Sequence, residues 1–244
     1  MYINLDVLNI TNGNTNMIDT EFGRMNIEKI EAGKLKLATG KIIATDPILM
    51  YDDESYSVHV KPGEYPVFIY VGKTENRKNQ TVVAEIRFND NDPVKWEMAL
   101  LAGESSKGFG HDEFMGYEVE NGLGCFMDES VMEILDVMDE DELEEYENNI
   151  RNSVKKSDCS CAQILIDKKN GSNIIVFASG WNEGTFPTYY GLDSNNKLSR
   201  LVTDFMVIEA FSELKVFFDY INFFFLKNHM HIINTEMLSA ITKE

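Results

Sequence analysis

The chain has 244 residues, with 22 Lys or Arg against 41 Asp or Glu, and a formal net charge of -19. A field of that sign repels phosphate backbones and anionic lipids, so the charge excludes nucleic acid and membrane surfaces as main partners. Hydrophobic residues make up 43% of the chain, which suits a globular core and argues against general disorder.

The cysteines and the N-terminus bear on the compartment. Cys125, Cys159 and Cys161 do not form a disulfide framework, and the Cys159–Cys161 spacing is too short for a zinc knuckle, so we expect reduced thiols. The first residues, MYINLDVLNITNGN, lack the basic and apolar regions of a signal peptide. The longest apolar run, 216–226, is far shorter than the roughly 20 residues of a membrane span. The expected location is the cytoplasm.

Most of the first 208 residues predict strands separated by turns. Alternating or β-branched apolar residues predict strands within 34–47, 56–60, 65–71, 81–88, 173–179 and 197–208. A turn at Thr39-Gly40 divides the first of these, and 56–60 and 65–71 are expected to pair as a hairpin. The Asn195-Asn196 pair suits the positive φ angles of a tight hairpin turn.

Helices are expected in three places. Segment 94–103 suits two to three turns closed by Gly103. Segment 129–156 has apolar residues at helical spacing and predicts one amphipathic helix, or two joined near Asp139. The Phe-rich segment 209–244 predicts a C-terminal helix or helix pair that packs on the core or on a partner, including a second copy of the chain.

These elements predict an α+β fold. The expected architecture is mostly antiparallel strands and hairpins, in a sandwich or twisted sheet, with one long acidic helix and a C-terminal Phe-rich helix. Residues 1–208 are expected to form a single domain, with 209–244 as a helical appendage.

Several carboxylates and one histidine are candidates for hydrolytic chemistry. Asp46 and Asp128 each end an apolar strand, a position that suits either a catalytic carboxylate or a turn cap. His111 and Asp112, together with Asp204, are candidate ligands for a divalent cation. Glycines flank the His111 cluster, however, and neighbouring strand residues point to opposite faces, which favours a solvated loop. Known nucleophile, phosphate-loop and zinc-protease motifs are absent from the sequence.

The acidic segment admits two interpretations. Residues 128–147 contain eleven acidic and no basic side chains. This face is either merely solvated, or it docks into a basic partner whose association is accelerated by charge. The residues expected to bind such a partner are Asp139, Glu140, Asp141, Glu142, Glu144 and Glu145.

The stretch SGWNEGTFPTYYGLD, residues 179–193, combines glycines with large aromatics. A loop packed over a sheet edge is the preferred interpretation. A small-ligand pocket is the weaker one, and its lining would be Trp181, Phe186, Tyr189 and Tyr190.

Five strings, in order, resemble a bacterial family, the domain of unknown function 4241 family. They are GKIIATDP, VKPGEYPV, GYEVENGLGCFMD, FASGWNEGTFPTYYGLD and LVTDF, and they cover about 35–208. Glu183 and Glu120 stand where the family pattern has a shorter Asp, which puts an identical role for these carboxylates in doubt. The resemblance implies no established reaction.

The sequence therefore leaves two functions. The first is a non-enzymatic, acidic interaction protein, of immunity type or related to phage conflict, that binds a basic protein. The alternative is a metal-dependent hydrolase of phosphoesters or nucleotides, with Asp46, Asp128 and Glu183 as catalytic carboxylates. No organic cofactor is expected, and the hydrolase alone would need a divalent cation.

Overall fold

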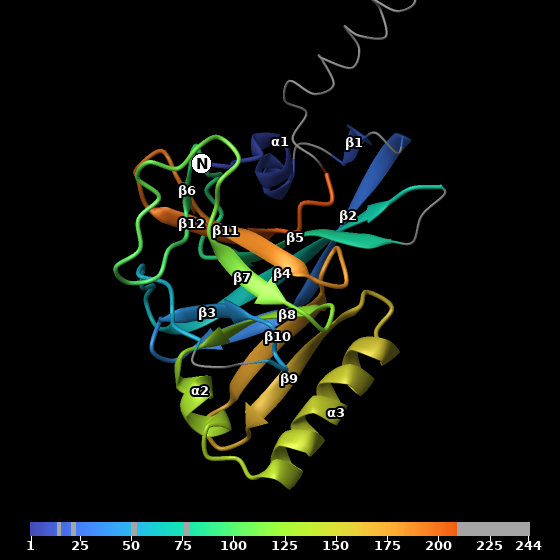
Figure 1. Cartoon of the computed structure of the whole chain (residues 1–244), viewed down its shortest axis with the longest axis vertical. Helices are drawn as coiled ribbons and strands as arrows, with labels where there is room; N and C mark the ends of the chain where they lie inside the picture. Colours follow the sequence, from blue (N-terminus) through green and yellow to red (C-terminus); the bar gives the residue numbers. More distant parts are fainter. Residues whose placement is uncertain (14–15, 21–22, 50–52, 76–78, 209–244) are drawn as a thin grey trace, which may run out of the picture. The chain divides into compact units, whose positions relative to one another are not determined.

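Two antiparallel sheets form the framework of the computed structural model (Figure 1). The structure describes residues 1–208 except 14–15, 21–22, 50–52 and 76–78. Within it, Met1–Ile208 form one compact unit. The large sheet has the strand order β1-β2-β4-β5-β12-β11-β6, with β7 paired to β11. Its strands are β1 (Met17–Thr20), β2 (Gly23–Leu37), β4 (Gly63–Lys73), β5 (Gln80–Arg87), β6 (Lys95–Met98), β7 (Gly116–Val119), β11 (Gly184–Leu192) and β12 (Leu198–Asp204).

The small sheet has the order β3-β8-β10-β9. Its strands are β3 (Ile42–Thr45), β8 (Leu123–Asp128), β9 (Cys161–Asp167) and β10 (Ser172–Ala178). Alternate residues of β8 and β10 face opposite ways, as the period of two requires. Phe126, Ile175 and Phe177 join the core against the large sheet, whereas Met127 and Val176 join a second core on the other side.

Aromatic rings fill the space between the sheets. Phe126 and Phe177 meet edge to face with centroids 5.0 Å apart, and Phe177 continues to Phe205 at 5.9 Å. Phe205 in turn meets Phe186 of β11 at 5.1 Å. Edge-to-face contacts of this kind add stability beyond the burial of apolar area. This ring chain therefore fixes one sheet on the other.

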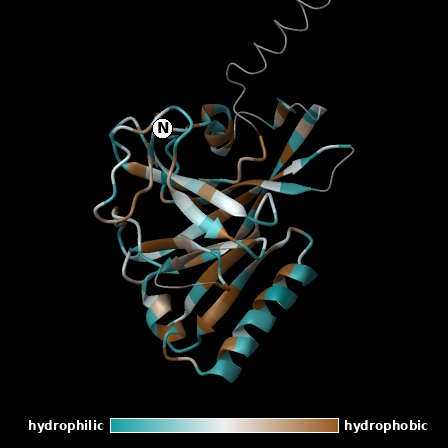
Figure 2. Cartoon of the chain, in the orientation of Figure 1, coloured by the Kyte–Doolittle hydropathy of each residue, from teal (hydrophilic) through white to brown (hydrophobic). Residues whose placement is uncertain are grey.

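Two helices cover the outer face of the small sheet. They are α2 (Ser130–Leu135) and α3 (Glu140–Lys156). Tyr146, Ile150 and Val154 form the buried stripe of α3. Figure 2 shows α3 with hydrophobic residues toward the sheet and hydrophilic ones outward. The burial of this stripe, rather than helix propensity, holds α3 in place.

The N-terminal segment covers the other face of the large sheet. It contains α1 (Leu5–Leu8) and the 3-10 turn η1 (Asn9–Asn12), and α1 contacts β5 and β12. The Tyr189 hydroxyl donates to the Tyr2 carbonyl over 2.7 Å. Beneath the segment, Glu85 is fully buried and lies 2.7 Å from both Arg87 Nε and Arg200 Nε. An ion pair this deep needs both partners, since a lone buried charge is costly.

The α+β fold expected from the sequence is wrong. Strands account for 44% of the described residues and helices for 16%, so this part of the protein is mostly antiparallel β with small helices attached. The physical reason is that the main core lies between two sheets, and each helix adds only one apolar stripe. Segment 129–156 is divided into α2 and α3, because Asp139 begins a new helix as its N-cap. The expected C-terminal helix lies outside the described residues.

Three local expectations also fail. Segment 56–60 is not a strand, and β4 pairs instead with β2 and β5. Segment 94–103 contains β6, in which buried Trp96 and Met98 alternate with exposed Glu97. Cys159 and Cys161 form a disulfide in place of two free thiols. The hairpin turn is confirmed, since β11 pairs with β12 and Asn196 has a φ of 57°.

No helix within the described residues is both long and apolar enough to cross a membrane.

Candidate functional site

Asp128 is a structural carboxylate at the end of β8. Its Oδ2 accepts hydrogen bonds from the Thr39 backbone N–H at 3.0 Å, the Thr39 hydroxyl at 2.9 Å and the Gly40 N–H at 3.2 Å. Its Oδ1 accepts from the backbone N–H and the hydroxyl of Ser130. Both oxygens are thus occupied by protein donors, and the side chain is 1% exposed. Asp128 caps two turns and offers little to a substrate.

Asp46 is held in the same manner. Its Oδ2 accepts from the backbone N–H groups of Glu120 and Asn121, both at 3.0 Å. Its Oδ1 accepts from the Ile48 N–H at 2.9 Å. This buried carboxylate therefore fixes the turn between β7 and β8 to the end of β3.

Asp204 is buried at the end of β12. Its Oδ1 accepts from the Met206 N–H at 2.8 Å. Burial raises the pKa of Asp204 to about 7, and hydrogen bonding to Met206 and Tyr2 opposes this rise. Asp204 is 0% exposed, so its carboxyl faces the protein interior.

The other hydrolase candidates are exposed and scattered. His111 and Asp112 lie in a loop with side chains 85% and 97% exposed. Glu183 is exposed in the loop before β11, and Glu120 in the turn before β8. In the part of the chain that the structure describes, no group of three His, Cys, Asp or Glu side chains is arranged to hold a metal ion. The structure therefore does not bring the predicted catalytic and metal residues together.

The acidic residues of α3 form an exposed face on a rigid support. Asp139 accepts from the Glu142 N–H at 2.9 Å, and Glu142 accepts in return from the Asp139 N–H at 3.1 Å, a capping box. All side chains of residues 139–145 are exposed. None of their carboxylates forms an ion pair with a Lys or Arg among the described residues. Val137 and Leu143, 80% and 37% exposed, lie within this acidic segment.

A cavity of about 460 Å³ lies beside the loops that follow β3 and β6. Its walls include the aromatic side chains of Tyr56 and Tyr117, and burial raises the pKa of both hydroxyls, so they stay neutral. Five carboxylates also line it, from Asp53, Glu54, Glu104, Glu118 and Glu120. We call it the acidic cavity. The segment 45–49 connects it to α3, because the Tyr146 hydroxyl donates to the Pro47 carbonyl over 3.1 Å.

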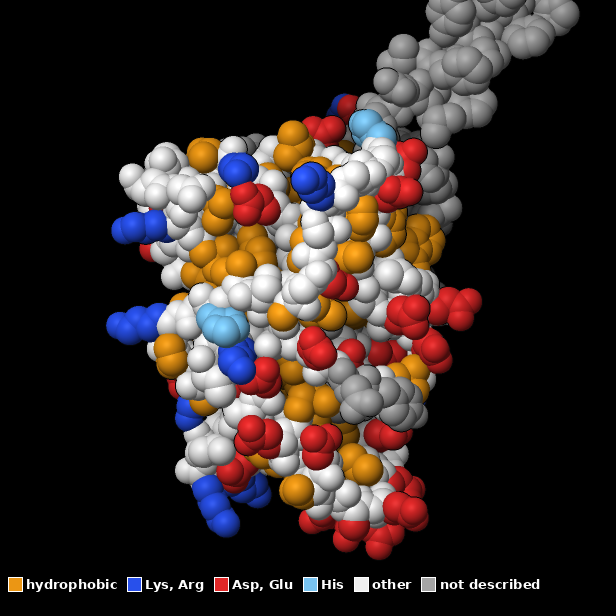
Figure 3. Space-filling model, turned by 60° about the vertical axis from the view of Figure 1, so that its left-hand side comes forward, with side chains coloured by type: hydrophobic (Ala, Val, Ile, Leu, Met, Phe, Trp, Pro, Cys, Tyr) orange, Lys and Arg blue, Asp and Glu red, His pale blue; other side chains and the backbone are white. Residues whose placement is uncertain are grey.

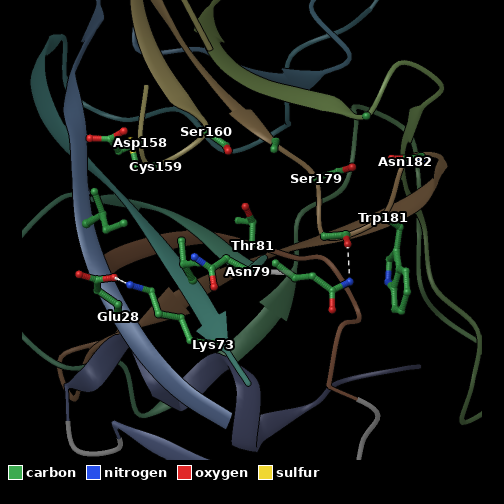
Figure 4. A pocket seen from close by; sticks show the side chains of 16 residues that line it. Glu28, Lys73, Asn79, Thr81, Asp158, Cys159, Ser160, Ser179, Trp181 and Asn182 are labelled. Atoms are coloured by element: carbon green, nitrogen blue, oxygen red, sulfur yellow. Dashed lines mark hydrogen bonds and ion pairs between the residues drawn. The ribbon is translucent and has the colours of Figure 1, made fainter. Parts of the chain in front are cut away.

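A second cavity, of about 520 Å³, lies at the loop that carries Trp181 (Figure 4). Gln80 Nε2 donates to the Gly180 carbonyl over 2.8 Å, and the Ser179 N–H donates to the Gly122 carbonyl over 2.9 Å. A Cβ on Gly180 would lie 2.6 Å from the Thr81 carbonyl oxygen and would also collide with Val207. Only glycine therefore allows the loop to pack here. We call this the Trp181 cavity.

The aromatics predicted to line a ligand pocket separate into two groups. Trp181 lines the Trp181 cavity and is 40% exposed. Phe186, Tyr189 and Tyr190 are buried in the core, at 2%, 0% and 3% exposure. Both tyrosine hydroxyls donate to backbone carbonyls, Tyr189 to Tyr2 and Tyr190 to Val58. Three of the four residues therefore have packing roles.

The family model described as a protein of unknown function, DUF4241, matches residues 35–203. The chain belongs to the DUF4241 family. The match includes both cavities' central loops and α3, and it confirms the resemblance seen in the sequence. No curated protein and no solved structure matches this DUF4241 chain significantly.

The DUF4241 sequence does not predict the lining of the acidic cavity. Asp53 and Glu54, Glu104, and the pair Glu118 and Glu120 come from three separate segments. No spacing within any one segment marks them, and only the general acidic excess is visible in the sequence. The same holds for Cys159, which joins Trp181 at the other cavity only through folding.

Proposed function

We propose that this DUF4241 member is a non-enzymatic binding protein, of immunity type or related to phage conflict, whose acidic surface docks a basic protein. The acidic surface comprises residues 139–145 and the acidic cavity. The observation that carries the proposal is the set of exposed carboxylates on α3 that no described Lys or Arg neutralises. A basic partner would gain Coulomb attraction to these α3 carboxylates without breaking ion pairs among the described residues.

The support under these carboxylates favours binding over mere solvation. The capping box fixes the first turn of α3, and Tyr146 anchors it to the sheet. The charges are therefore held in place before a partner arrives, which limits the ordering entropy lost on association. Figure 3 shows Asp and Glu side chains gathered at the lower end of the molecule, with hydrophobic side chains near them.

Exposed Val137 and Leu143 supply the apolar contact area that a purely charged surface lacks. Protein interfaces combine an apolar centre with a polar rim, and most binding energy comes from the centre. Val137 precedes α3 and Leu143 lies in its first turns, amid the unpaired carboxylates. We assign these two side chains to the centre of the docking surface.

The acidic cavity suits a cationic side chain of the same partner. Five carboxylates and the rings of Tyr56 and Tyr117 line it. Carboxylates attract a guanidinium or ammonium group, and aromatic faces add a cation–π contribution. A Lys or Arg of the docked protein would enter here.

The described residues contain no arrangement of catalytic or metal-binding side chains that supports the hydrolase alternative. The carboxylate oxygens of Asp46 and Asp128 accept hydrogen bonds from backbone donors, and Glu183 is exposed. Among the described residues no group of three His, Cys, Asp or Glu side chains is arranged to hold a metal ion. We therefore make no proposal of hydrolysis.

Titration calorimetry tests the proposed function. The candidates are basic proteins encoded beside this chain's gene, purified in catalytically inactive form. We expect one of them to bind, with an affinity that falls about tenfold or more between 50 and 300 mM salt, because the attraction is screened. Binding that is indifferent to salt, or no binding by any of them, would overturn the proposal.

A further inference from the structure

The Cys159–Cys161 disulfide lies at the Trp181 cavity and is unrelated to the acidic surface. It follows directly after α3 and opens β9. Cys159 lines the cavity and is partly exposed, whereas Cys161 is 4% exposed. Figure 4 shows Asp158, Cys159 and Ser160 on one side of the cavity and Ser179, Trp181 and Asn182 on the other.

We propose that this pair is a thiol–disulfide exchange site for low-molecular-weight thiols that enter through the Trp181 cavity. This goes beyond the proposed binding function. Exchange needs one sulfur that an attacking thiolate can reach and a second that can leave. The exposure of Cys159 and the burial of Cys161 supply this asymmetry.

The reduction proceeds in two balanced steps. An incoming thiolate attacks Cys159 Sγ, the bond between Cys159 and Cys161 breaks, and Cys161 leaves as a thiolate that takes up a proton. A second thiol attacks the sulfur of the first in this mixed disulfide, and Cys159 leaves as the other thiol. The pair gains two electrons and two protons, and two small thiols become one small disulfide. Oxidation is the reverse, with a small disulfide as the oxidant.

The neighbouring groups favour this chemistry at Cys159. Ser157 Oγ lies 2.8 Å from Cys159 Sγ, and its hydroxyl can donate to the thiolate that forms there. Ser160 between the cysteines has a φ of 53°, the left-handed region that few residues other than glycine adopt. Reduction frees this residue to relax, which favours opening of the pair.

The pair also connects two parts of the fold. The Ser160 carbonyl accepts from the Ala178 N–H at 2.8 Å, directly before Ser179 and the Trp181 loop. The Ser157 N–H donates to the Val154 carbonyl at the end of α3. The redox state of the pair therefore acts on the segment between α3 and the cavity.

The charge of the cavity selects among small thiols. Glu28 and Lys73 form an ion pair, which leaves Asp158, next to Cys159, as the unpaired charge of the lining. Together with the net charge of -19, this disfavours anionic thiols and favours those that carry an amine. The class we assign is a small aminothiol.

To test this proposal, the intact protein is first reduced. Its reoxidation is then measured with each of three disulfides, which are cystamine, hydroxyethyl disulfide and glutathione disulfide. Differential alkylation and mass spectrometry follow each cysteine. We expect cystamine to reoxidise the pair fastest and glutathione disulfide slowest, with rates about tenfold apart at low salt. Asp158→Asn should reduce this ratio of rates. The buried thiol of Cys125 is the internal reference and should stay unmodified.

A variant isolates the first step. In Cys161→Ser, Cys159 should retain a stable mixed disulfide with cysteamine, whereas in Cys159→Ser the buried Cys161 should react at least about tenfold more slowly. Circular dichroism checks that both variants fold. The proposal is wrong if Cys159 reacts no faster than Cys125 in the folded parent, or if glutathione disulfide is the fastest oxidant.

Discussion

The carboxylate of Asp128 accepts a 2.9 Å hydrogen bond from the hydroxyl of Thr39, 89 positions earlier in the chain. Thr39 lies in the turn where the chain leaves β2 of the large sheet for β3 of the small one. Asp128 therefore fixes the crossing between the two sheets. This role explains an acidic residue at the end of an apolar strand without any catalysis.

Replacing Asp128 should destabilise the fold. Asp128→Asn turns one oxygen into an N–H donor that faces donors already present at Thr39, Gly40 or Ser130. We expect a loss of about 3 kcal/mol in the free energy of unfolding, since buried donors lose their acceptor. Urea denaturation measures it, with exposed Glu64→Gln as a control that should change by less than about 0.5 kcal/mol. Parental stability in Asp128→Asn would contradict the structural role.

Breaking the buried ion pairs of Glu85 should cost more unfolding free energy than replacing Asp128. Glu85→Gln leaves Arg87 and the buried Arg200 without their shared counter-charge. The expected cost is about 3–5 kcal/mol, because two guanidinium groups stay in the interior with only the mostly exposed Asp92, 3.7 Å from Arg200, as a nearby counter-charge. Glu97→Gln, which breaks the exposed pair with Lys95, is the matched control and should cost less than about 0.5 kcal/mol. Equal losses of unfolding free energy in Glu85→Gln and Glu97→Gln would contradict the distinction between the buried and the exposed ion pair.

Asp204 predicts a specific dependence of stability on pH. Its pKa is about 7 in the fold against an ordinary value of 3.8 for an aspartate, so the folded state holds a proton that the unfolded state releases. The contribution of Asp204 to the free energy of unfolding is on the order of 4 kcal/mol at most. It is fully present below about pH 4 and is lost as the pH rises toward 7.

Asp204→Asn should remove this dependence. The variant is expected to be more stable than the parent by about 2 kcal/mol at pH 8, and its advantage should shrink toward pH 4. Urea denaturation at several pH values measures both proteins. Parallel stability profiles for parent and variant would count against a raised pKa at this site.

The Trp181 loop depends on Gly180 for packing and not on Trp181. Gly180→Ala brings a Cβ to 2.6 Å from the Thr81 carbonyl oxygen and should cost about 1–3 kcal/mol. Trp181→Ala removes a side chain that is 40% exposed and should cost clearly less. Thermal unfolding compares the two, and a greater loss for Trp181→Ala would contradict this division of roles.

Local patterns predicted several elements correctly. The β-branched residues of 81–88 and the apolar run of 173–179 predict β5 and β10, because a strand buried on both faces shows itself in apolar content. Asn196 predicts the β11–β12 turn through its tolerance of positive φ. Trp96 and Met98 misled the prediction, since a short apolar run fits both a helix and a strand.

The arrangement of the sheets and cavities could not be predicted in this way. β12 pairs with β5, β11 with β6 and β7, and β3 with β8, and these pairings join distant segments that carry no local register signal. The acidic cavity depends on these pairings. The roles of Asp46 and Asp128 likewise depend on which backbone N–H groups folding brings to them.

The acidic surface makes the central prediction. Glu140, Asp141, Glu144 and Glu145 can be neutralised together to the corresponding amides while Asp139 and Glu142 keep their capping box. The matched control neutralises four exposed carboxylates elsewhere, those of Glu31, Glu64, Glu75 and Asp90, and so changes the net charge equally.

The most direct measurement is the dissociation constant for the basic partner, determined for the parent, the α3 variant and the control variant by titration calorimetry at 100 mM salt. Docking through α3 predicts that the α3 variant binds about 30-fold more weakly and the control less than about threefold, because rim charges act locally. Equal weakening in both variants, or none in the α3 variant, would contradict the assignment of the acidic surface as the binding site.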